Sequence, residues 1–319
     1  MSNSRSARSV LLSLVATVVL AAGGCQSGEV SAPPLMRSAV PAPTPAANQA
    51  DGLMLPNDPA SLKLAVVGDS GTGGSAQYRV AEAMAFYQTR FDYKIVLMAG
   101  DNMYGSQEPS DYAEKFELPY KTLLDRGVKF YAALGNHDLP DQRFYEPLNL
   151  GGERYHTVKL ADAVRLYVLD SSYVDPDQVA WFKKELETSD SPWKIALLHH
   201  PLYSAARRHG SDMELRRTIE PLLVANGADV VFAGHDHVYE RTKPQRGITH
   251  FVIGNSAKLR KGDLRRDQTT AAGFDSGYSF MLVEILDDEL HFQAINDEYE
   301  TIDNGVIRER TSAVELTSK

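Results

Sequence analysis

Three apolar runs separated by two helical segments predict a layered α/β fold. The runs cover residues 62–68, 93–99 and 128–134, and each has the apolar character of a buried strand. Between the first two, residues 75–89 repeat apolar side chains at three- and four-residue intervals, as an amphipathic helix does. A second helix is expected over residues 111–126. This β-α-β-α-β alternation is typical of a sheet covered by helices.

The second half of the chain continues the alternation and ends in strands. Asp175-Pro176 is a good start signal for a helix over 177–187. A helix is also expected over 213–225, between two further strands. The expected strands are 155–159 and 164–169 as a near-hairpin, 194–198, 228–233, 248–253, 278–286, 290–294 and a segment near Val306.

Composition and charge limit the possible functions. The chain has 319 residues, 43% of them hydrophobic and 9% aromatic, so it is long enough for a large core and has an ordinary globular composition. It carries 42 acidic against 33 basic residues. An acidic balance gives no reason to expect a nucleic-acid partner.

The N-terminus has the pattern of an export signal. Arg5 and Arg8 precede an apolar run that ends at Ala22, followed by small residues and Cys25, the only cysteine. Residues 1–24 are therefore predicted to be a signal peptide. The sequence Ala-Gly-Gly-Cys resembles the lipobox of bacterial lipoproteins, which implies a lipid anchor on Cys25 and a place in the periplasm or at the outer membrane. An ordinary signal peptide cut nearby is the alternative.

Residues 25–61 are rich in Pro, Ala and Ser and show no apolar period. Such a segment cannot bury enough apolar surface to order itself. We predict a tether over 25–61 and a single domain over 62–319, with the lipid anchor as its only membrane contact.

Five short motifs follow one another, most of them where a predicted strand ends. They offer two carboxylates, a phenol, an amide and at least three imidazoles, which is enough to hold two metal ions. One Gly-Asp alone is an ordinary turn, but Asp69 and Asp101 both end apolar strands separated by one helix, so they should lie side by side. The motifs are Gly68-Asp69-Ser70-Gly71, Gly100-Asp101-Asn102-Met103-Tyr104, Gly135-Asn136-His137-Asp138, Leu198-His199-His200-Pro201 and Gly234-His235-Asp236-His237.

The histidine spacing indicates which imidazoles share a site. His235 and His237 are two apart on a segment expected to be extended, so both rings should face one side. The adjacent His199 and His200 should face opposite sides, so that one binds metal and the other supports it. The three histidines outside the motifs are expected to be satisfied core or surface residues: His156, His250 and His291.

The glycines of the first motif also suggest a phosphate-binding loop over 68–74. This segment lacks the Gly-Lys-Ser/Thr ending of a P-loop and the spacing of a dinucleotide fingerprint. Nucleotide binding there is not favoured.

In their order, the five motifs resemble those of the calcineurin-like metallophosphoesterases. The Gly-Asp-x-x-Tyr sequence that ends at Tyr104 is similar to that of the purple acid phosphatases. The resemblance runs from about residue 63 to residue 260. It implies a four-layer α/β/β/α sandwich of two mixed sheets, with a binuclear metal centre between them.

The resemblance also implies a division of the ligands. It assigns Fe(III) to one set and a divalent ion (Fe, Zn or Mn) to another, with Asp101 bridging the two ions. His199 is chosen over His200 because the family's ligand stands two residues before the proline. Anionic oxygens suit the trivalent ion, whereas imidazole and amide suit the divalent one. The sets are Asp69, Tyr104 and His237 for Fe(III), and Asn136, His199 and His235 for the divalent ion.

The implied activity is that of an acid phosphatase acting on phosphorylated small molecules. Direct attack by a metal-bound hydroxide is expected, with His137 and His209 as candidates to protonate the leaving group. Asp138 is expected to support its neighbours by hydrogen bonding. Two alternatives stay open: a phosphodiesterase or pyrophosphatase on the same scaffold, and a surface lipoprotein that binds without catalysis.

Overall fold

The computed structural model describes residues 52–310. The predicted signal peptide, Cys25 and most of the predicted tether lie outside this range, so these predictions stay open. In the range that the structure covers, no helix is long and apolar enough to cross a membrane.

The first described residues, 52–61, lie against the domain. Leu55 is buried, and the backbone N–H groups of Asn57 and Asp58 donate to the Glu284 carboxylate at 2.7 and 2.6 Å. The last ten residues that we assigned to the tether therefore contact the domain. The boundary at residue 62 stays a prediction.

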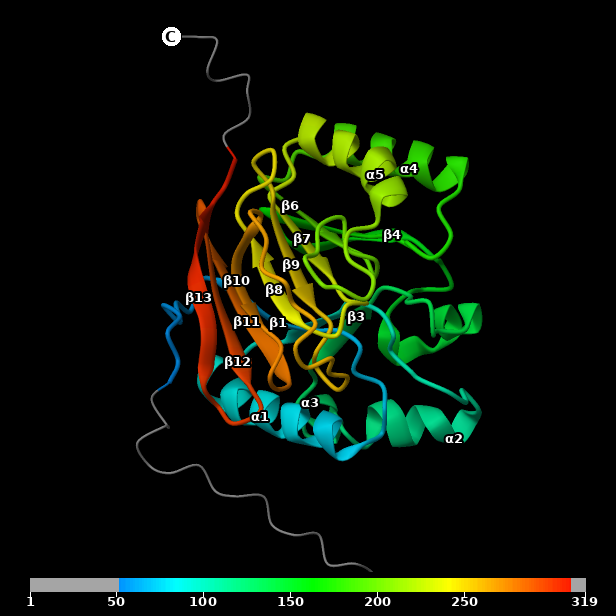
Figure 1. Cartoon of the computed structure of the whole chain (residues 1–319), viewed down its shortest axis with the longest axis vertical. Coiled ribbons are helices and arrows are strands. Elements are labelled where there is room, and N and C mark those ends of the chain that lie inside the picture. Colours follow the sequence, from blue (N-terminus) through cyan, green and yellow to red (C-terminus); the bar gives the residue numbers. More distant parts are fainter. Residues whose placement is uncertain (1–51, 311–319) are drawn as a thin grey trace, which may run out of the picture. The chain divides into compact units, whose positions relative to one another are not determined.

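Two mixed sheets pack face to face, and helices cover the outer face of each (Figure 1). The first sheet has the order β13 (Thr301–Arg308), β12 (Glu289–Asn296), β11 (Ser279–Leu286), β1 (Leu62–Val67), β2 (Ile95–Met98) and β3 (Lys129–Ala132). The second has the order β10 (Thr270–Phe274), β8 (Tyr239–Thr242), β9 (Thr249–Ile253), β7 (Val230–Ala233), β6 (Trp193–Leu197), β5 (Val164–Val168) and β4 (His156–Ala161). The helices are α1 (Ser75–Phe91), α2 (Pro109–Tyr112) and α3 (Lys121–Asp125) beside the first sheet, and α4 (Pro176–Glu187) and α5 (Met213–Ala225) beside the second.

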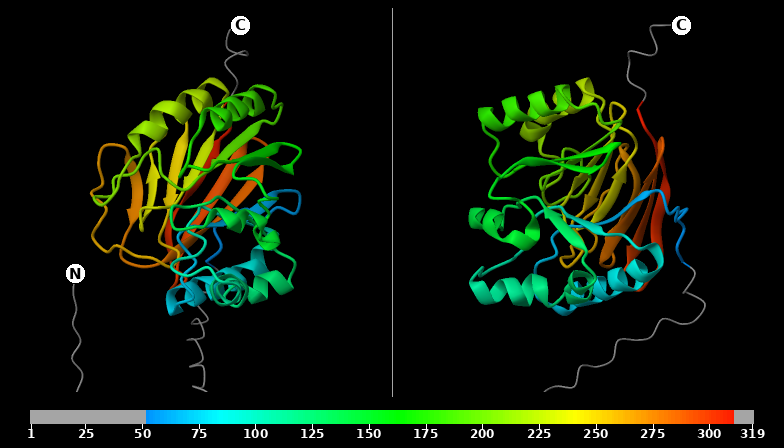
Figure 2. Two further views of the ribbon diagram at one scale, coloured as in Figure 1. Left: turned by 90° about the vertical axis from the view of Figure 1, so that its right-hand side faces the viewer. Right: turned by 180° about the vertical axis from the view of Figure 1, so that it is seen from behind.

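Figure 2 shows the same four layers from two further sides, which confirms the predicted α/β/β/α sandwich. Alternation along β1 explains the layering, because successive side chains point to opposite faces. Leu64 and Val66 join the apolar core between the sheets, whereas Ala65 and Val67 join the core under α1. A strand apolar on both faces is the expected outcome of this arrangement.

The parallel strands place the ends that carry the motifs together. In the first sheet β1 pairs in parallel with β2, and β2 with β3. In the second sheet β6 pairs in parallel with β7. Neighbouring parallel strands end at the same edge of a sheet, so the motifs that follow them meet there.

The two predicted helices of the second half are confirmed. Helix α4 starts at Pro176, and its N-cap Asp175 accepts a hydrogen bond from the Gln178 backbone at 2.7 Å. Helix α5 starts at Met213, and its N-cap Asp212 accepts from the Leu215 backbone at 2.9 Å. A side-chain oxygen at the N-cap satisfies amides that have no partner in the helix, and so fixes where each helix begins.

The predicted helix over 111–126 is wrong as one continuous element. It divides into α2, a π-helical turn over Ala113–Glu117, and α3. Pro119 lies between the last two, and proline cannot donate the backbone hydrogen bond that would continue the helix. The two strands that we did not predict, β8 and β10, are short and lack an apolar run.

His250 and His156 differ from the prediction that they are satisfied. Both residues lie outside the five motifs, as expected. In the described structure, however, the two ring nitrogens of each residue have no hydrogen-bond partner. Burial and, to a smaller extent, the charge of Arg216 lower the pKa of His250 from its ordinary value of 6.5 to about 3. The third residue, His291, contacts Glu289 at 3.0 Å, as expected for a satisfied surface group.

We therefore expect His250 to make the fold sensitive to acid. Between pH 6.5 and 3 the unfolded chain protonates this residue and the folded chain does not, so its contribution to stability falls as the pH falls through that window. His250→Phe should reduce the loss of unfolding free energy on acidification, measured by urea unfolding at several pH values. His291→Gln is the control, and equal slopes for wild type and His250→Phe would contradict this expectation.

Candidate binuclear metal centre

Three acceptor atoms from distant parts of the chain meet at one edge of the sheets. The Tyr104 hydroxyl lies 2.8 Å from Asp69 Oδ1 and 3.3 Å from His237 Nε2. His237 Nε2 also lies 3.3 Å from Asp69 Oδ1. These three residues form the first set, and they are the group that the resemblance assigns to Fe(III).

A second set lies beside the first. Asn136 Oδ1 lies 3.0 Å from His199 Nε2 and 2.9 Å from His235 Nδ1. The two imidazole nitrogens lie 3.3 Å apart. These residues follow β3, β6 and β7, so both sheets contribute to the second set.

Asp101 lies between the two sets. Its Oδ1 is 3.4 Å from His199 Nε2 of the second set. Ligand atoms of Asp69, Asp101 and His199 all lie within 4.8 Å of one another. One carboxylate that is close to both sets has the position that a bridging ligand needs.

The acceptor spacing fits two cations. Ligand atoms about 2.0–2.1 Å from one ion, at angles of about 90–109° to each other, are about 2.9–3.3 Å apart. Both sets have distances of this size. Oxygen and nitrogen acceptors at such distances repel one another unless protons or cations lie between them.

The backbone at three of these residues is strained. Asp69, Asp101 and His235 have positive φ angles of 52°, 50° and 71°. Residues other than glycine rarely adopt this conformation, and where they do it is often at a functional site. The turn lets each side chain reach from a strand end into the space between the sheets.

Glycine clears the space beside Asp69. A Cβ atom on Gly234 would lie 2.5 Å from Asp69 Oδ2 and 2.7 Å from the Ala99 carbonyl oxygen. The Gly-His motif can therefore pack against Asp69 only because position 234 is glycine.

The His235–His237 segment corrects our prediction. It is a bend between β7 and β8 and not an extended strand. The two rings consequently contact different sets: His235 lies in the second and His237 in the first. The prediction that both reach one centre agrees with the geometry, but strand alternation is not the reason.

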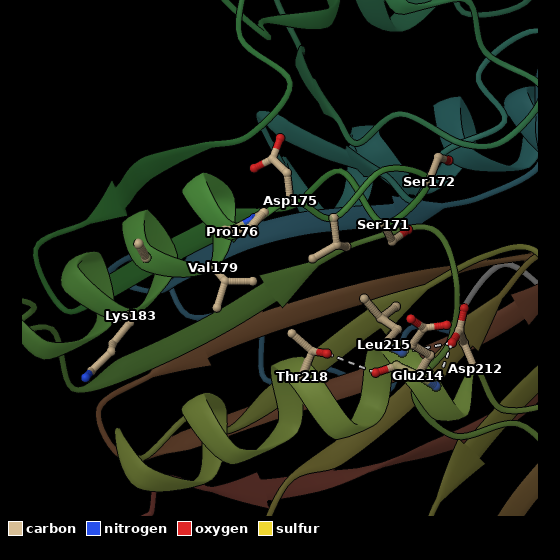
Figure 3. Close-up of a pocket in the computed structure, with 12 residues that line it drawn as sticks. Ser171, Ser172, Asp175, Pro176, Val179, Lys183, Asp212, Glu214, Leu215 and Thr218 are labelled. Atoms are coloured by element: carbon tan, nitrogen blue, oxygen red, sulfur yellow. Dashed lines mark hydrogen bonds between the residues drawn. The ribbon is translucent and has the colours of Figure 1, made fainter.

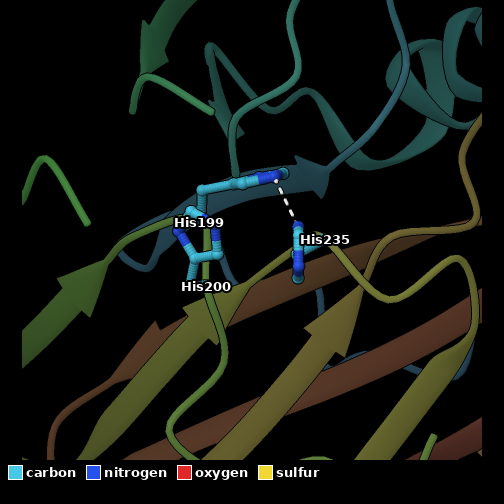
Figure 4. A group of neighbouring side chains, drawn as sticks. All are labelled: His199, His200 and His235. Carbon is cyan, nitrogen blue, oxygen red and sulfur yellow. Dashed lines mark hydrogen bonds between the residues drawn. The ribbon is translucent and has the colours of Figure 1, made fainter. Parts of the chain in front are cut away.

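His199 and His200 also differ from the prediction, because their rings do not face opposite sides. The chain bends directly after β6, and the ring centroids are 5.0 Å apart. Figure 4 shows these two rings beside His235, and the three residues form a compact imidazole cluster.

The hydrogen bonds of the two rings distinguish them. His199 Nδ1 lies 2.8 Å from the Ala99 carbonyl oxygen, so this nitrogen carries the proton and Nε2 is free to bind a cation. His200 Nδ1 instead contacts the Ser171 hydroxyl at 3.0 Å.

Burial favours the neutral forms of the acids and imidazoles of the centre. Burial raises the pKa of the Asp69 carboxyl, and the nearby Asp101 raises it further. Burial also raises the pKa of the Tyr104 hydroxyl. For the imidazoles, burial lowers the pKa of His235 to about 2 and that of His237 to about 4. Neutral imidazoles are ready ligands, and bound cations would restore the ionised form of the acids.

The Calcineurin-like phosphoesterase family model matches residues 62–239, more than half of the chain. The chain belongs to the calcineurin-like phosphoesterase family. This confirms the resemblance that the five motifs predicted.

Several relatives of this phosphoesterase are purple acid phosphatases of Arabidopsis thaliana. Purple acid phosphatase 5 is 30% identical over 194 residues, which are 59% of this chain and 46% of the relative. Fe(3+)-Zn(2+) purple acid phosphatase 12 is 30% identical over 50% of this chain and 39% of its own length. Purple acid phosphatase 4 is 27% identical over 74% of this chain and 80% of its own length. The chain thus spans less than half of the first two.

Solved structures show the same fold. A purple acid phosphatase from yellow lupin (Lupinus luteus) aligns with a TM-score of 0.63 at 19% identity, over 80% of this chain and 55% of its own. A dimetal phosphatase from Danio rerio aligns with a TM-score of 0.62 at 13% identity, over 78% and 99%. GAP50, the anchor in the inner membrane complex of Plasmodium, aligns with 0.69 at 15% identity, over 79% and 90%.

The two candidate proton donors lie beside different acceptor sets. The His137 ring centroid is 4.8 Å from that of Tyr104, in the first set. The His209 ring centroid is 4.2 Å from that of His235, in the second. Both residues are exposed, so a substrate can reach them.

Asp138 has the supporting position that we predicted. Its carboxylate accepts hydrogen bonds from the backbones of Gly135, Asn102 and Met103 at 2.8–3.0 Å. Burial raises its pKa to about 7, and Asp101 contributes to that rise. Asp138 thereby ties the turn that carries Asn136 to the turn after β2.

Ser171 is a supporting residue that the sequence did not reveal. Its hydroxyl accepts hydrogen bonds from the backbone N–H groups of His199 and His200 at 3.1 and 2.9 Å. It also lines a cleft between the N-terminal ends of α4 and α5 (Figure 3). None of the predicted site residues lines that cleft.

The glycine-rich segment after β1 does not form a phosphate-binding loop. The backbone N–H groups of Thr72 and Gly73 donate to the Gln77 side chain at 3.1 and 2.8 Å. The donors that would bind a phosphate are thus already used, in agreement with the sequence prediction.

Asp236 was part of a motif, but we assigned it no role. It is fully buried between His235 and His237, and its Oδ2 accepts hydrogen bonds from the Ser204 hydroxyl at 2.7 Å and the Gly210 backbone at 3.1 Å. Both bonds hold the loop that carries His209.

Replacing Asp236 with Ala should therefore release this loop. We expect kcat/KM to fall about 10–100-fold, as for other residues that support metal ligands, because His209 and His235 lose their common support. Asp236→Asn should lose less, since the amide oxygen still accepts from Ser204. Steady-state kinetics on a phosphate ester measure this, and wild-type kcat/KM for Asp236→Ala would exclude the role.

Proposed function

We propose that this phosphoesterase is a binuclear-metal acid phosphatase that hydrolyses phosphate monoesters. The observation that carries the proposal is the pair of acceptor sets with Asp101 between them. Relatives named as purple acid phosphatases support it through sequence similarity. When bound, two ions lower the pKa of water and neutralise charge on phosphoryl oxygens.

Two different sets of residues would hold the two metal ions. Asp69, Tyr104 and His237 would hold Fe(III), because two anionic oxygens suit a trivalent ion. Asn136, His199 and His235 would hold the divalent ion (Fe, Zn or Mn), because neutral nitrogen and amide ligands suit it.

His137 and His209 would act on the leaving group. Each is exposed and lies beside one acceptor set, so a phosphate bound at the centre would be near both rings. A protonated imidazole can donate its proton to the departing alkoxide oxygen as the P–O bond breaks.

The test of the activity compares a monoester with a diester. The full-length protein, loaded with iron and zinc, should hydrolyse 4-nitrophenyl phosphate in preference to bis(4-nitrophenyl) phosphate. A preference for the diester would favour the alternative of a phosphodiesterase. Absence of turnover with two ions bound would favour the alternative of a protein that binds without catalysis.

The metal assignment has its own test. A ferric ion bound to a tyrosinate gives a visible charge-transfer band, so the wild-type protein should be coloured and Tyr104→Phe should lose the band. His137→Gln is a control that leaves the first set intact. A colourless wild-type protein with zinc or manganese at both positions would overturn the ferric assignment.

The location of the protein is a separate proposal. The N-terminal pattern supports export and a lipid anchor on Cys25 in a bacterial periplasm or outer membrane. Fractionation of cells that express the full chain tests it, and recovery of the whole protein in the soluble cytosolic fraction would exclude it.

A further inference from the structure

Two loops beside the metal centre concentrate positive charge in an acidic chain. Residues 204–210 and 258–266 together contain seven basic residues and one acidic residue, Asp263, although the whole chain has nine more acidic than basic residues. We call the basic residues of these two loops the basic cluster. The negative net charge of the whole chain gave no indication of this local excess of basic residues.

Backbone contacts join the two loops. Ala206 and Leu264 form an antiparallel bridge. The Arg207 N–H donates to the Asp263 carbonyl oxygen at 2.9 Å, and the Arg265 N–H donates to the Ala205 carbonyl oxygen at 3.2 Å. The basic side chains therefore belong to one rigid surface and not to two independent loops.

The basic cluster is attached to the metal centre. Lys258 Nζ lies 4.4 Å from the centroid of the Tyr104 ring, and the Arg260 N–H donates to the His237 carbonyl oxygen at 3.1 Å. On the other loop, Arg208 precedes His209, whose ring lies 4.2 Å from that of His235. A group bound at the centre would thus lie within reach of the cluster.

Four members of the cluster have no carboxylate partner. Among residues 52–310, no ion pair of 4.0 Å or less involves Arg207, Arg208, Lys258 or Arg260. By contrast, Arg241 contacts Asp303 at 2.7 Å.

Nearby carboxylates accept hydrogen bonds from other groups of the two loops. Asp236 accepts from Ser204 and Gly210, Glu240 accepts from the Ala205 N–H at 2.7 Å, and Asp275 accepts from the Leu264 N–H at 3.0 Å. The buried Oδ2 of Asp263 accepts none.

One donor of the basic cluster, on Arg260, is available to an acceptor. Its Nη1 is buried and has no hydrogen-bond partner in the described structure. A buried donor without an acceptor is costly, so native proteins nearly always supply one. An anion on the cluster would accept from this nitrogen.

We propose that the basic cluster is a subsite for a second phosphate group of the substrate. The preferred substrates would then be small molecules with two phosphate groups, one at the metal centre and the other on the cluster. Binding of a nucleic acid is less favoured, because neither loop contains Phe, Tyr or Trp on which bases could stack. The inference rests on the proposed function, since it names the substrate class of the same centre.

The first test measures binding without turnover. Full-length metal-loaded protein is titrated in a calorimeter with methylenebisphosphonate and with methylphosphonate. The double variant Arg207→Gln/Arg208→Gln removes two exposed charges whose side chains make no hydrogen bond in the described structure. Arg217→Gln, an exposed position on α5, is the matched control.

The expected result is a selective loss. Wild type and Arg217→Gln should bind the bisphosphonate about tenfold more tightly than the monophosphonate, and the double variant should lose most of this preference. Methylphosphonate affinity and metal content should stay the same. Equal affinity of wild type for the two ligands, or an equal loss for both in the double variant, would overturn the proposal. The proposal would also be overturned if the double variant lost binding to DNA or to anionic lipid vesicles but kept its preference for the bisphosphonate.

Kinetics separate this inference from the proposed function. In wild type, kcat/KM for pyrophosphate should decrease more steeply with salt than kcat/KM for 4-nitrophenyl phosphate, and the double variant should lose that difference. If wild type keeps the bisphosphonate preference but hydrolyses neither substrate, the activity is wrong and the subsite stands. If both substrates are hydrolysed and no preference exists, the subsite is wrong and the activity stands.

Discussion

Replacing Asp101 with Asn will reduce kcat/KM for phosphate monoesters by about 10³-fold or more. Asn has nearly the same size but no charge, so it cannot balance two cations at once. Metal ions supply several kcal/mol of charge stabilisation in such reactions, and each 1.36 kcal/mol is tenfold in rate. Steady-state kinetics, together with the metal content of the same sample, measure the effect.

Asp190→Asn is the matched control, because Asp190 is an exposed carboxylate outside the centre. It should keep the wild-type activity and metal content. Asp101 does not bridge two cations if Asp101→Asn retains two ions per chain and full activity.

The second large effect is expected from Gly135→Ala. A Cβ atom there would lie 2.2 Å from the Asp101 backbone nitrogen and 2.3 Å from Asp101 Oδ1, far inside van der Waals contact. Gly135 has no positive φ angle, so the substitution acts through space alone. We expect a loss of unfolding free energy of about 1–3 kcal/mol, typical of overpacking, and the loss of a bound metal ion.

Gly74→Ala provides the comparison, since its Cβ would be 3.4 Å from the Thr72 hydroxyl, an ordinary contact. Urea unfolding and metal analysis of both variants test the argument. A Gly135→Ala protein with wild-type stability and two bound ions would show that the turn after β3 does not need glycine.

The parts of the fold that local sequence determines were predictable. Strands β1 and β2 are apolar on both faces, and a Gly-Asp pair follows the end of each, so their burial and their common edge followed from the sequence alone. Helices α4 and α5 begin with an Asp cap and could be placed within one residue.

Long-range pairing was not predictable in the same way. β11 pairs with β1 although more than 200 residues separate Leu62 from its partner Ile285. The short strands β8 and β10 carry no run of large apolar residues that would indicate a strand. Pro119 breaks a helix that periodicity alone would continue.

The candidate site shows the same limit. The seven predicted ligands stand in short motifs, so they could be listed from the sequence, whereas their supporting residues depend on contacts between distant loops. Ser171 and Lys258 belong to none of the five motifs, and Asp236 could be given its role only when its contact with Ser204 was known.

Metal titration tests the central claim most directly. Full-length protein stripped of metal is mixed with increasing equivalents of iron and zinc, and bound metal and hydrolysis of 4-nitrophenyl phosphate are measured on each sample. We predict that bound metal saturates at two ions per chain and that activity requires both. Saturation at one ion, or full activity without metal, would contradict the account.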